Sequence, residues 1–205
     1  FTNGALKNIS ISRNFFSTLQ ENQINSVYIE VDSQVTEFYF DSNQFVELKC
    51  KGEDGGAGLH IKTGAVIEVT NCKFDSCVGS GENSGMIRIP DESNYGAQLV
   101  FNLCQFSCEK SQENNARAVC IAGNSLIRFN SCRFLSFEES NRDGVVLYSE
   151  SISSTVFYNC TFLGLKGIHL MTMPNAEAAE ILDCQFSSCE VGEFLITAES
   201  ATNFT

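Results

Sequence analysis

Apolar and polar residues alternate in short stretches that end on a phenylalanine, and this pattern recurs along the chain. The clearest copy runs from Ile67 to Cys77, with Phe74 as its marker. Counting back from Phe74, apolar residues stand at positions −2, −5 and −7, which are Cys72, Val69 and Ile67. Alternation with a period of two is typical of strands that place every second side chain inward. We therefore predict short strands in each copy.

A step of three residues separates the −5 and −2 positions and breaks the alternation. A bulge or tight bend at this place would return both apolar pairs to the same interior. Asn and Asp tolerate left-handed backbone and hydrogen-bond to their own chain, so they suit such a corner. The corner position is predicted at Asn71, Asn102, Asn130, Asn159 and Asp183.

The marker phenylalanine recurs at Phe16, Phe40, Phe74, Phe106, Phe134, Phe162 and Phe186, with steps of 24, 34, 32, 28, 28 and 24 residues. In this alignment Phe38 takes the place of the cysteine in the early copy. Each copy also holds a small residue followed by an apolar run, as in Gly58-Leu59-His60-Ile61. Repeats of this period indicate a solenoid. We predict an all-β fold of about seven parallel coils, with the marker phenylalanines stacked inside it.

Two segments carry a resemblance to a known family. Gly55 to Ile61 reads Gly-Gly-Ala-Gly-Leu-His-Ile, and Phe74 to Cys77 reads Phe-Asp-Ser-Cys. Together they resemble the GGA(I/L) and FxxN repeats of polymorphic outer-membrane adhesins, although the Asn of FxxN is present only at Asn43. More broadly, the chain resembles right-handed parallel β-helix repeat proteins, which include pectate lyases and the passenger domains of surface adhesins. The resemblance implies a right-handed parallel β-helix.

Five cysteines follow the same repeat and would form a second stacked column: Cys72, Cys104, Cys132, Cys160 and Cys184. Three interpretations stay open. Buried cysteine packs as a small hydrophobic residue. Disulfides are an alternative, and their candidates flank a predicted corner: Cys72/Cys77, Cys104/Cys108 and Cys184/Cys189. Metal ligation is disfavoured because the intervening phenylalanine occupies the interior and no second matching pair completes a zinc site.

Composition and charge limit the partners. The net charge of −12 and the pI near 4.5 argue against nucleic acid, which needs clustered Lys and Arg. No run of 18 apolar residues exists, so we expect no membrane span in this segment. The repeat extends from end to end, and we expect residues 1–205 to be a single β-helix domain and a segment of a longer β-helix. The three Asn-x-Ser/Thr triplets, at Asn8, Asn159 and Asn203, carry little weight on sequence alone.

Candidate chemistry is sparse. Glu30, His60 and Arg88 stand at equivalent positions of the apolar runs and are weak candidates for an outward acid/base line, since a solvated polar face is the more ordinary explanation. The acidic loop pairs Asp91-Glu92 and Glu138-Glu139 suggest at most weak Ca²⁺ binding. No catalytic motif is present, and we expect no catalytic residues and no other cofactor.

These observations favour a non-catalytic structural or adhesive module of a secreted or cell-surface protein. Its expected partners are protein or carbohydrate at a cell surface. Exposed strand edges at the ends of the coil would also allow end-to-end association into fibres. The alternative is a polysaccharide-binding or polysaccharide-cleaving domain, a lyase or hydrolase, on the same fold.

Overall fold

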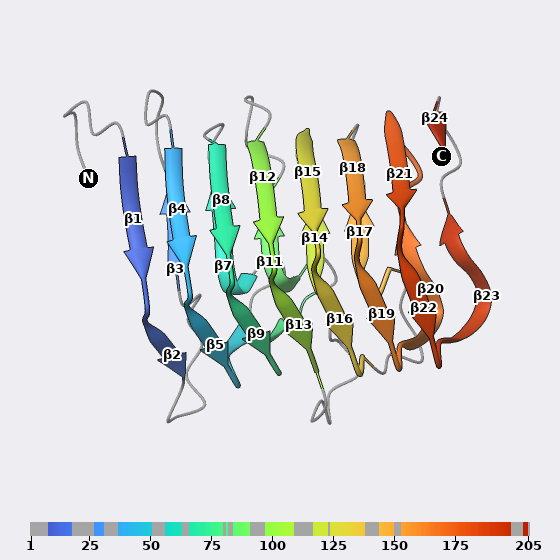
Figure 1. The fold of residues 1–205 in the computed structure, drawn as a ribbon, viewed down its shortest axis with the longest axis horizontal. Coiled ribbons are helices and arrows are strands. Elements are labelled where there is room, and N and C mark those ends of the chain that lie inside the picture. Colours follow the sequence, from blue (N-terminus) through green and yellow to red (C-terminus); the bar gives the residue numbers. More distant parts are fainter. Residues whose placement is uncertain are drawn as a thin grey trace.

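The protein is a stack of parallel strands without helices in the described residues (Figure 1). The computed structural model describes residues 8–17, 27–30, 37–50, 56–62, 66–79, 81, 84–90, 97–108, 117–122, 124–137, 144–149, 153–197 and 203–204. Successive turns follow one another along the long axis, from β1 at the N-terminal end to β24 at the other. The predicted all-β parallel solenoid is confirmed.

Three long parallel sheets make up the walls. Sheet A has eight strands: β1 (Asn8–Ser12), β4 (Glu37–Asp41), β8 (Val66–Thr70), β12 (Ala97–Asn102), β15 (Ser125–Asn130), β18 (Ser153–Tyr158), β21 (Ala178–Leu182) and β24 (Asn203–Phe204). Sheet B has seven: β2 (Phe15–Ser17), β5 (Gln44–Val46), β9 (Lys73–Asp75), β13 (Gln105–Ser107), β16 (Arg133–Leu135), β19 (Thr161–Leu163) and β22 (Gln185–Ser187).

Sheet C also has seven strands: β3 (Val27–Glu30), β7 (Gly56–Lys62), β11 (Gly85–Ile89), β14 (Val119–Ile121), β17 (Leu147–Ser149), β20 (Lys166–Thr172) and β23 (Glu190–Thr197). A short two-stranded sheet joins β6 (Lys49–Cys50) and β10 (Val78–Gly79). About five turns of the solenoid pack between two neighbouring turns, rather than the predicted seven coils. The first and last sets of strands pack against a neighbour on one side among the described strands, and their side chains are partly exposed.

A left-handed residue stands between sheets A and B in every turn. Its φ lies between 52° and 58° at Arg13, Ser42, Asn71, Leu103, Ser131, Asn159 and Asp183. The predicted corner is therefore present, but two of its residues are corrected. Asn102 and Asn130 end β12 and β15, and the bend falls one residue later, on Leu103 and Ser131. A second left-handed corner after sheet B, at Glu47, Ser76, Ser136, Gly164 and Ser188, was not predicted.

The predicted phenylalanine stack exists in sheet B with one correction. Its members are Phe16, Phe45, Phe74, Phe106, Phe134, Phe162 and Phe186, with neighbouring ring centroids 4.4–5.1 Å apart and interplanar angles of 1–10°. Phe45 takes the place predicted for Phe40, which pairs with Val69 in sheet A. The error arose because Phe40-Asp41-Ser42 has the same letters as Phe74-Asp75-Ser76, although Ser42 is the first corner and Ser76 the second.

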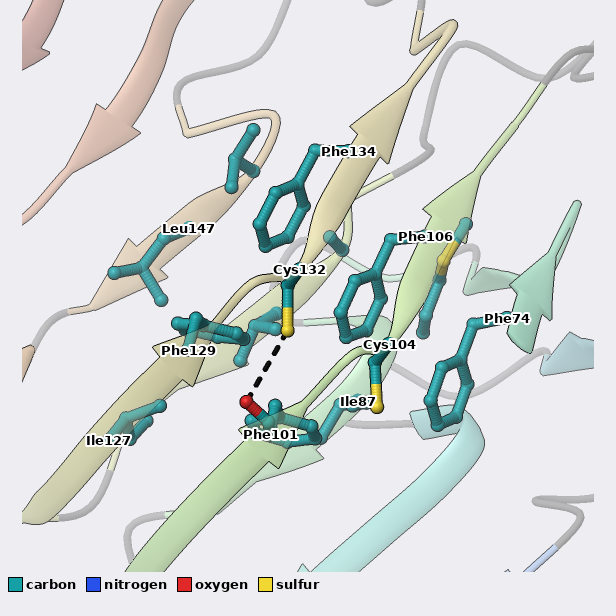
Figure 2. Packing of buried hydrophobic residues seen from close by; sticks show 14 of the residues in the cluster. Phe74, Ile87, Phe101, Cys104, Phe106, Ile127, Phe129, Cys132, Phe134 and Leu147 are labelled. Atoms are coloured by element: carbon teal, nitrogen blue, oxygen red, sulfur yellow. Dashed lines mark hydrogen bonds between the residues drawn. The ribbon is translucent and has the colours of Figure 1, made fainter. Parts of the chain in front are cut away.

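A second aromatic stack lies in sheet A and meets the first edge-on. Phe101, Phe129 and Phe157 stack with centroids 4.7–4.9 Å apart, and their rings meet those of sheet B at 64–78°. Figure 2 shows Phe101 and Phe129 facing Phe106 and Phe134 across the interior. Stacked and edge-on contacts are the two preferred geometries of aromatic pairs. The centre of the solenoid is therefore a continuous aromatic core.

One buried hydroxyl group interrupts the aliphatic column of sheet A. Thr155 lies between Ile127 and Ala179 in register, is 1% exposed, and has an Oγ1 without a hydrogen-bond partner. An unsatisfied buried hydroxyl costs about 1–3 kcal/mol. We expect Thr155→Val to raise the free energy of unfolding by about 1 kcal/mol, measured by urea denaturation. Thr161→Val, at a partly exposed position, is the control and should give no gain; equal effects would contradict the prediction.

Candidate functional site

The sequence-predicted candidates lie on the outer face of sheet C. His60 and Arg88 are in register on β7 and β11, as predicted. Cys120 of β14, Tyr148 of β17 and Thr172 of β20 continue the row in register. We call these five residues the outer row of sheet C.

Glu30 does not belong to this row. Its Cα position pairs with Lys62, and Tyr28 is the residue in register with His60. Tyr28 and Glu30 are two residues apart in β3, so a period of two could not tell which of them is in register with His60. The proposed acid/base line therefore lacks its acid.

The outer row of sheet C is buried rather than solvated as predicted. His60 is 8% exposed, Arg88 3% and Cys120 0%. Arg117, just before β14, is 5% exposed and lies with its guanidinium carbon 4.3 Å from the centroid of the Tyr148 ring, a cation–π contact. Arg117 was not predicted from the sequence because it lies outside the apolar run. No sequence signal marked it.

Two guanidinium groups converge on one sulfur. Arg88 Nη1 donates to Cys120 Sγ at 3.3 Å, and Arg117 Nη1 donates to the same atom at 3.8 Å. Such groups are suited to holding an anionic or polarisable acceptor. In the described part of the chain no group of three or more His, Cys, Asp or Glu residues could hold a metal ion. The loop pairs Asp91-Glu92 and Glu138-Glu139, the candidates for Ca²⁺, lie outside the described residues.

The predicted cysteine column runs beside the first corner. Cys72, Cys104, Cys132, Cys160 and Cys184 occupy equivalent positions, and none of the ten cysteines forms a disulfide. The six candidate disulfide residues are therefore thiols in this structure: Cys72, Cys77, Cys104, Cys108, Cys184 and Cys189. The column thiols are hydrogen-bonded. The Cys132 thiol, for example, donates to the carbonyl oxygen of Phe101 in the preceding turn of the solenoid, with Sγ and the oxygen 3.4 Å apart (Figure 2).

Asparagine fills the same column in the early turns. Asn43 Nδ2 donates to the Ile11 carbonyl at 2.8 Å, and its Oδ1 accepts from the Asn14 N–H at 2.9 Å. Cys72 makes the corresponding pair one turn later: its thiol lies 3.6 Å from the Phe40 carbonyl, and it accepts from the Asn43 N–H at 3.4 Å. The left-handed corner interrupts the hydrogen-bond ladder between strands. A side chain that can both donate and accept a hydrogen bond satisfies the backbone N–H and C=O groups left without ladder partners there. Cysteine does so without bringing a strongly polar group into the core.

The interior thiols are poorly suited to nucleophilic chemistry. Burial raises the pKa of Cys77 to about 12 and also raises the pKa of Cys72. The hydrogen bond to Cys104 is the largest cause that raises the pKa of Cys132, and the hydrogen bond to Cys132 does the same for Cys160. Because the thiolate is the reactive form, these groups stay protonated and inert near neutral pH.

Exchange at Cys132 tests the equivalence of cysteine and asparagine. We expect Cys132→Ala to lower the free energy of unfolding by about 1–3 kcal/mol, because the Phe101 carbonyl loses its cross-turn donor. Cys132→Asn should lose clearly less, since the amide can copy the bonds of Asn43. Urea denaturation under reducing conditions measures both. Equal losses would show that the hydrogen bonds do not determine the residue at this position.

Comparison with known proteins adds no identity. No protein-family model, curated protein or solved structure matches this chain. The assignment to a parallel β-solenoid rests on the strand pairing itself. Within the described ranges, no helix has the length and apolarity needed to cross a bilayer.

Proposed function

We propose that this chain is a non-catalytic structural or adhesive module of a secreted or cell-surface protein, similar to the β-helical adhesins it resembles in sequence. The observation that carries the proposal is the continuity of the core columns. The phenylalanine stack passes through every described turn from Phe16 to Phe186, and the cysteine and asparagine column runs beside it. A rod of this kind supports a long, regular outer surface for protein or carbohydrate partners.

The end turns support association along the axis. Phe186 is 36% exposed at one end of the phenylalanine stack, and Phe16 is only partly buried at the other. β24 pairs with only Ala178 and Ala179 of β21. Among the described strands, β22 and β23 lie at the edges of sheets B and C, and edge strands pair readily with further strands. A second copy, or further turns of a longer chain, would continue every column.

Sedimentation velocity over a range of concentrations tests the assembly. We expect the 205-residue chain to form head-to-tail oligomers that grow with concentration, because a heterologous contact does not close. Phe186→Asp should abolish the oligomers by placing a charge on the exposed end of the stack. Phe15→Asp is the matched control: Phe15 is 63% exposed but lies on the outer face of β2. A chain that stays monomeric, or two variants that act alike, would overturn end-to-end assembly.

A second candidate is binding or cleavage of a polysaccharide on the same fold. Arg88, Arg117 and His60 gather two cations and an imidazole beside the Tyr148 ring, and because these three side chains are only 3–8% exposed, a polymer would contact their outermost atoms alone. Incubation with acidic and neutral polysaccharides, with and without Ca²⁺, tests this candidate. Arg88→Gln should then weaken binding of acidic polymers, whereas Arg128→Gln, an exposed arginine of sheet A, should not. Absence of binding and of cleavage products across the panel would exclude it.

A further inference from the structure

Exposed apolar side chains occupy the last outward position of sheet A in the later turns. The last outward position of sheet A is polar in the earlier turns, at Ser12, Asp41, Thr70, Asn102 and Asn130, and then becomes Tyr158 and Leu182. Tyr158 is 48% exposed and Leu182 37%. On the adjoining outer face of sheet B, Leu163 is 39% exposed. An apolar patch that replaces a polar row indicates that something covers it.

An asparagine of an Asn-x-Thr triplet stands in this patch. Asn159 immediately follows Tyr158 and forms the corner, with φ of 53° and an exposed side chain. Its Nδ2 donates to Ser131 Oγ at 3.0 Å, so the amide lies along the outer ridge. Cys160 points into the core, and Thr161 begins β19 with a partly exposed side chain. The corner thus presents Asn159 to solvent and leaves Thr161 within reach of it.

The other two triplets lie in extended backbone. Asn8 belongs to the edge strand β1 and Asn203 to the edge strand β24. N-linked glycosylation selects surface positions of secreted proteins, where the amide can be approached outside regular strand pairing. Of the three, Asn159 alone combines a bend with an adjoining exposed aromatic ring.

We propose that Asn159 carries an N-linked oligosaccharide whose first sugars pack over Tyr158, Leu182 and Leu163. The inference rests on the secreted or surface role proposed above. In the transfer, Asn159 Nδ2 forms a bond to the anomeric carbon of an oligosaccharide carried on a polyprenyl diphosphate. The bond from that carbon to the diphosphate oxygen breaks, the diphosphate leaves with the electron pair, and the amide gives up one proton. No oxidation occurs, and one amide N–H remains for Ser131 Oγ.

A sugar suits this patch because of its two-sided chemistry. The C–H faces of a pyranose pack against apolar and aromatic side chains, while its hydroxyl groups remain in water. Tyr158 presents the same combination, an apolar ring with a polar tip. Covalent attachment at the neighbouring residue holds the sugar over the ring without the loss of translational freedom that a separate ligand would incur. The polar residues at the last outward position of sheet A in the earlier turns are solvated by water and need no sugar over them.

Expression of the 205-residue chain behind a signal peptide in eukaryotic cells tests the site, with peptide mass spectrometry before and after glycosidase treatment. We expect one glycan on Asn159, lost in Asn159→Gln and in Thr161→Ala and retained in Thr161→Ser. Lys73→Thr is the matched control, because it completes a triplet at Asn71, which has φ of 53° and an Nδ2 bond of 3.2 Å to Ser42 Oγ. A secreted chain that lacks sugar at Asn159, whether or not Asn71 gains one, overturns the proposal.

Dye binding tests the packing of the sugar. Removal of the glycan should raise the fluorescence of a hydrophobic dye such as ANS, and Tyr158→Thr together with Leu182→Thr should abolish the rise. A rise of the same size in the double variant would overturn the packing. The acceptor site and the secreted role can be told apart by comparing two sources of the protein. If the chain expressed behind a signal peptide carries the sugar at Asn159 but the protein from its natural source does not, the secreted role is refuted and the acceptor site is upheld.

Discussion

Raising the pH from 8 to 10 is expected to lower the free energy of unfolding by a few kcal/mol, with most of the loss above about pH 9. Four buried thiols carry the effect: Cys72, Cys77, Cys132 and Cys160, whose pKa values are all raised above the ordinary 9.0 in the folded chain. The unfolded chain loses these protons near pH 9, whereas the folded chain retains them. The stabilisation is therefore complete below pH 9 and is lost as the pH rises toward the folded values, about 12 for Cys77.

Urea denaturation at a series of pH values, with a phosphine reductant to keep the thiols free, measures this dependence. A thiol such as Cys77, which stays protonated in the fold throughout the window, contributes about 1 kcal/mol per pH unit. Cys77→Ala should therefore reduce the slope by about that amount, whatever it does to stability at pH 7. A free energy that stays constant between pH 8 and 10, or a slope unchanged in Cys77→Ala, would show that the interior thiols ionise as readily in the fold as outside it.

The sequence predicts the sheets of this protein because its strongest signals are local and repeat once per turn. Phe74, Phe106, Phe134 and Phe162 each follow a cysteine by two residues, and this short, invariant spacing defines sheet B and the first corner. The prediction failed where the spacing is kept but the residue type changes. In the early turn asparagine replaces cysteine, so Asn43 gave no apolar signal and Phe40 was placed where Phe45 belongs.

The outer row of sheet C could not be derived in the same way. Alternation in β11 correctly places Arg88 on the face opposite Ile87 and Ile89, but alternation cannot tell a solvated face from a covered one. The burial of Arg88 and Cys120 depends on contacts between segments far apart in the sequence. The partnership of Arg117 with Tyr148 is equally non-local, since the two residues come from successive turns. Periodicity predicts on which face of the sheet a side chain lies. Whether that face contacts solvent or other protein segments depends on tertiary packing.

Phe134→Ala is expected to lower the free energy of unfolding by about 3–5 kcal/mol. Phe134 is fully buried, stacks on Phe106 and Phe162 at 4.9 and 5.1 Å, and meets Phe129 and Phe157 edge-on at 5.5 and 5.9 Å. Its removal opens a cavity shared by both aromatic stacks, and the parallel ladders above and below prevent the turns from closing over it. The loss should therefore lie near the upper end of that range.

Two further substitutions show whether the stack itself is responsible. Phe186→Ala removes a ring at the end of the same stack, where Phe162 is the one described ring that lies against it, and should cost clearly less. Phe15→Ala removes an exposed ring beside the stack and should change stability by less than about 0.5 kcal/mol. Urea denaturation compares all three at equal chain concentration, well below that of any self-association. Because the number of ring neighbours falls in this order, a graded loss is the signature of aromatic packing along the axis. Equal losses at Phe134 and Phe186 would mean that the turns are stabilised separately and that the rod does not act as one core.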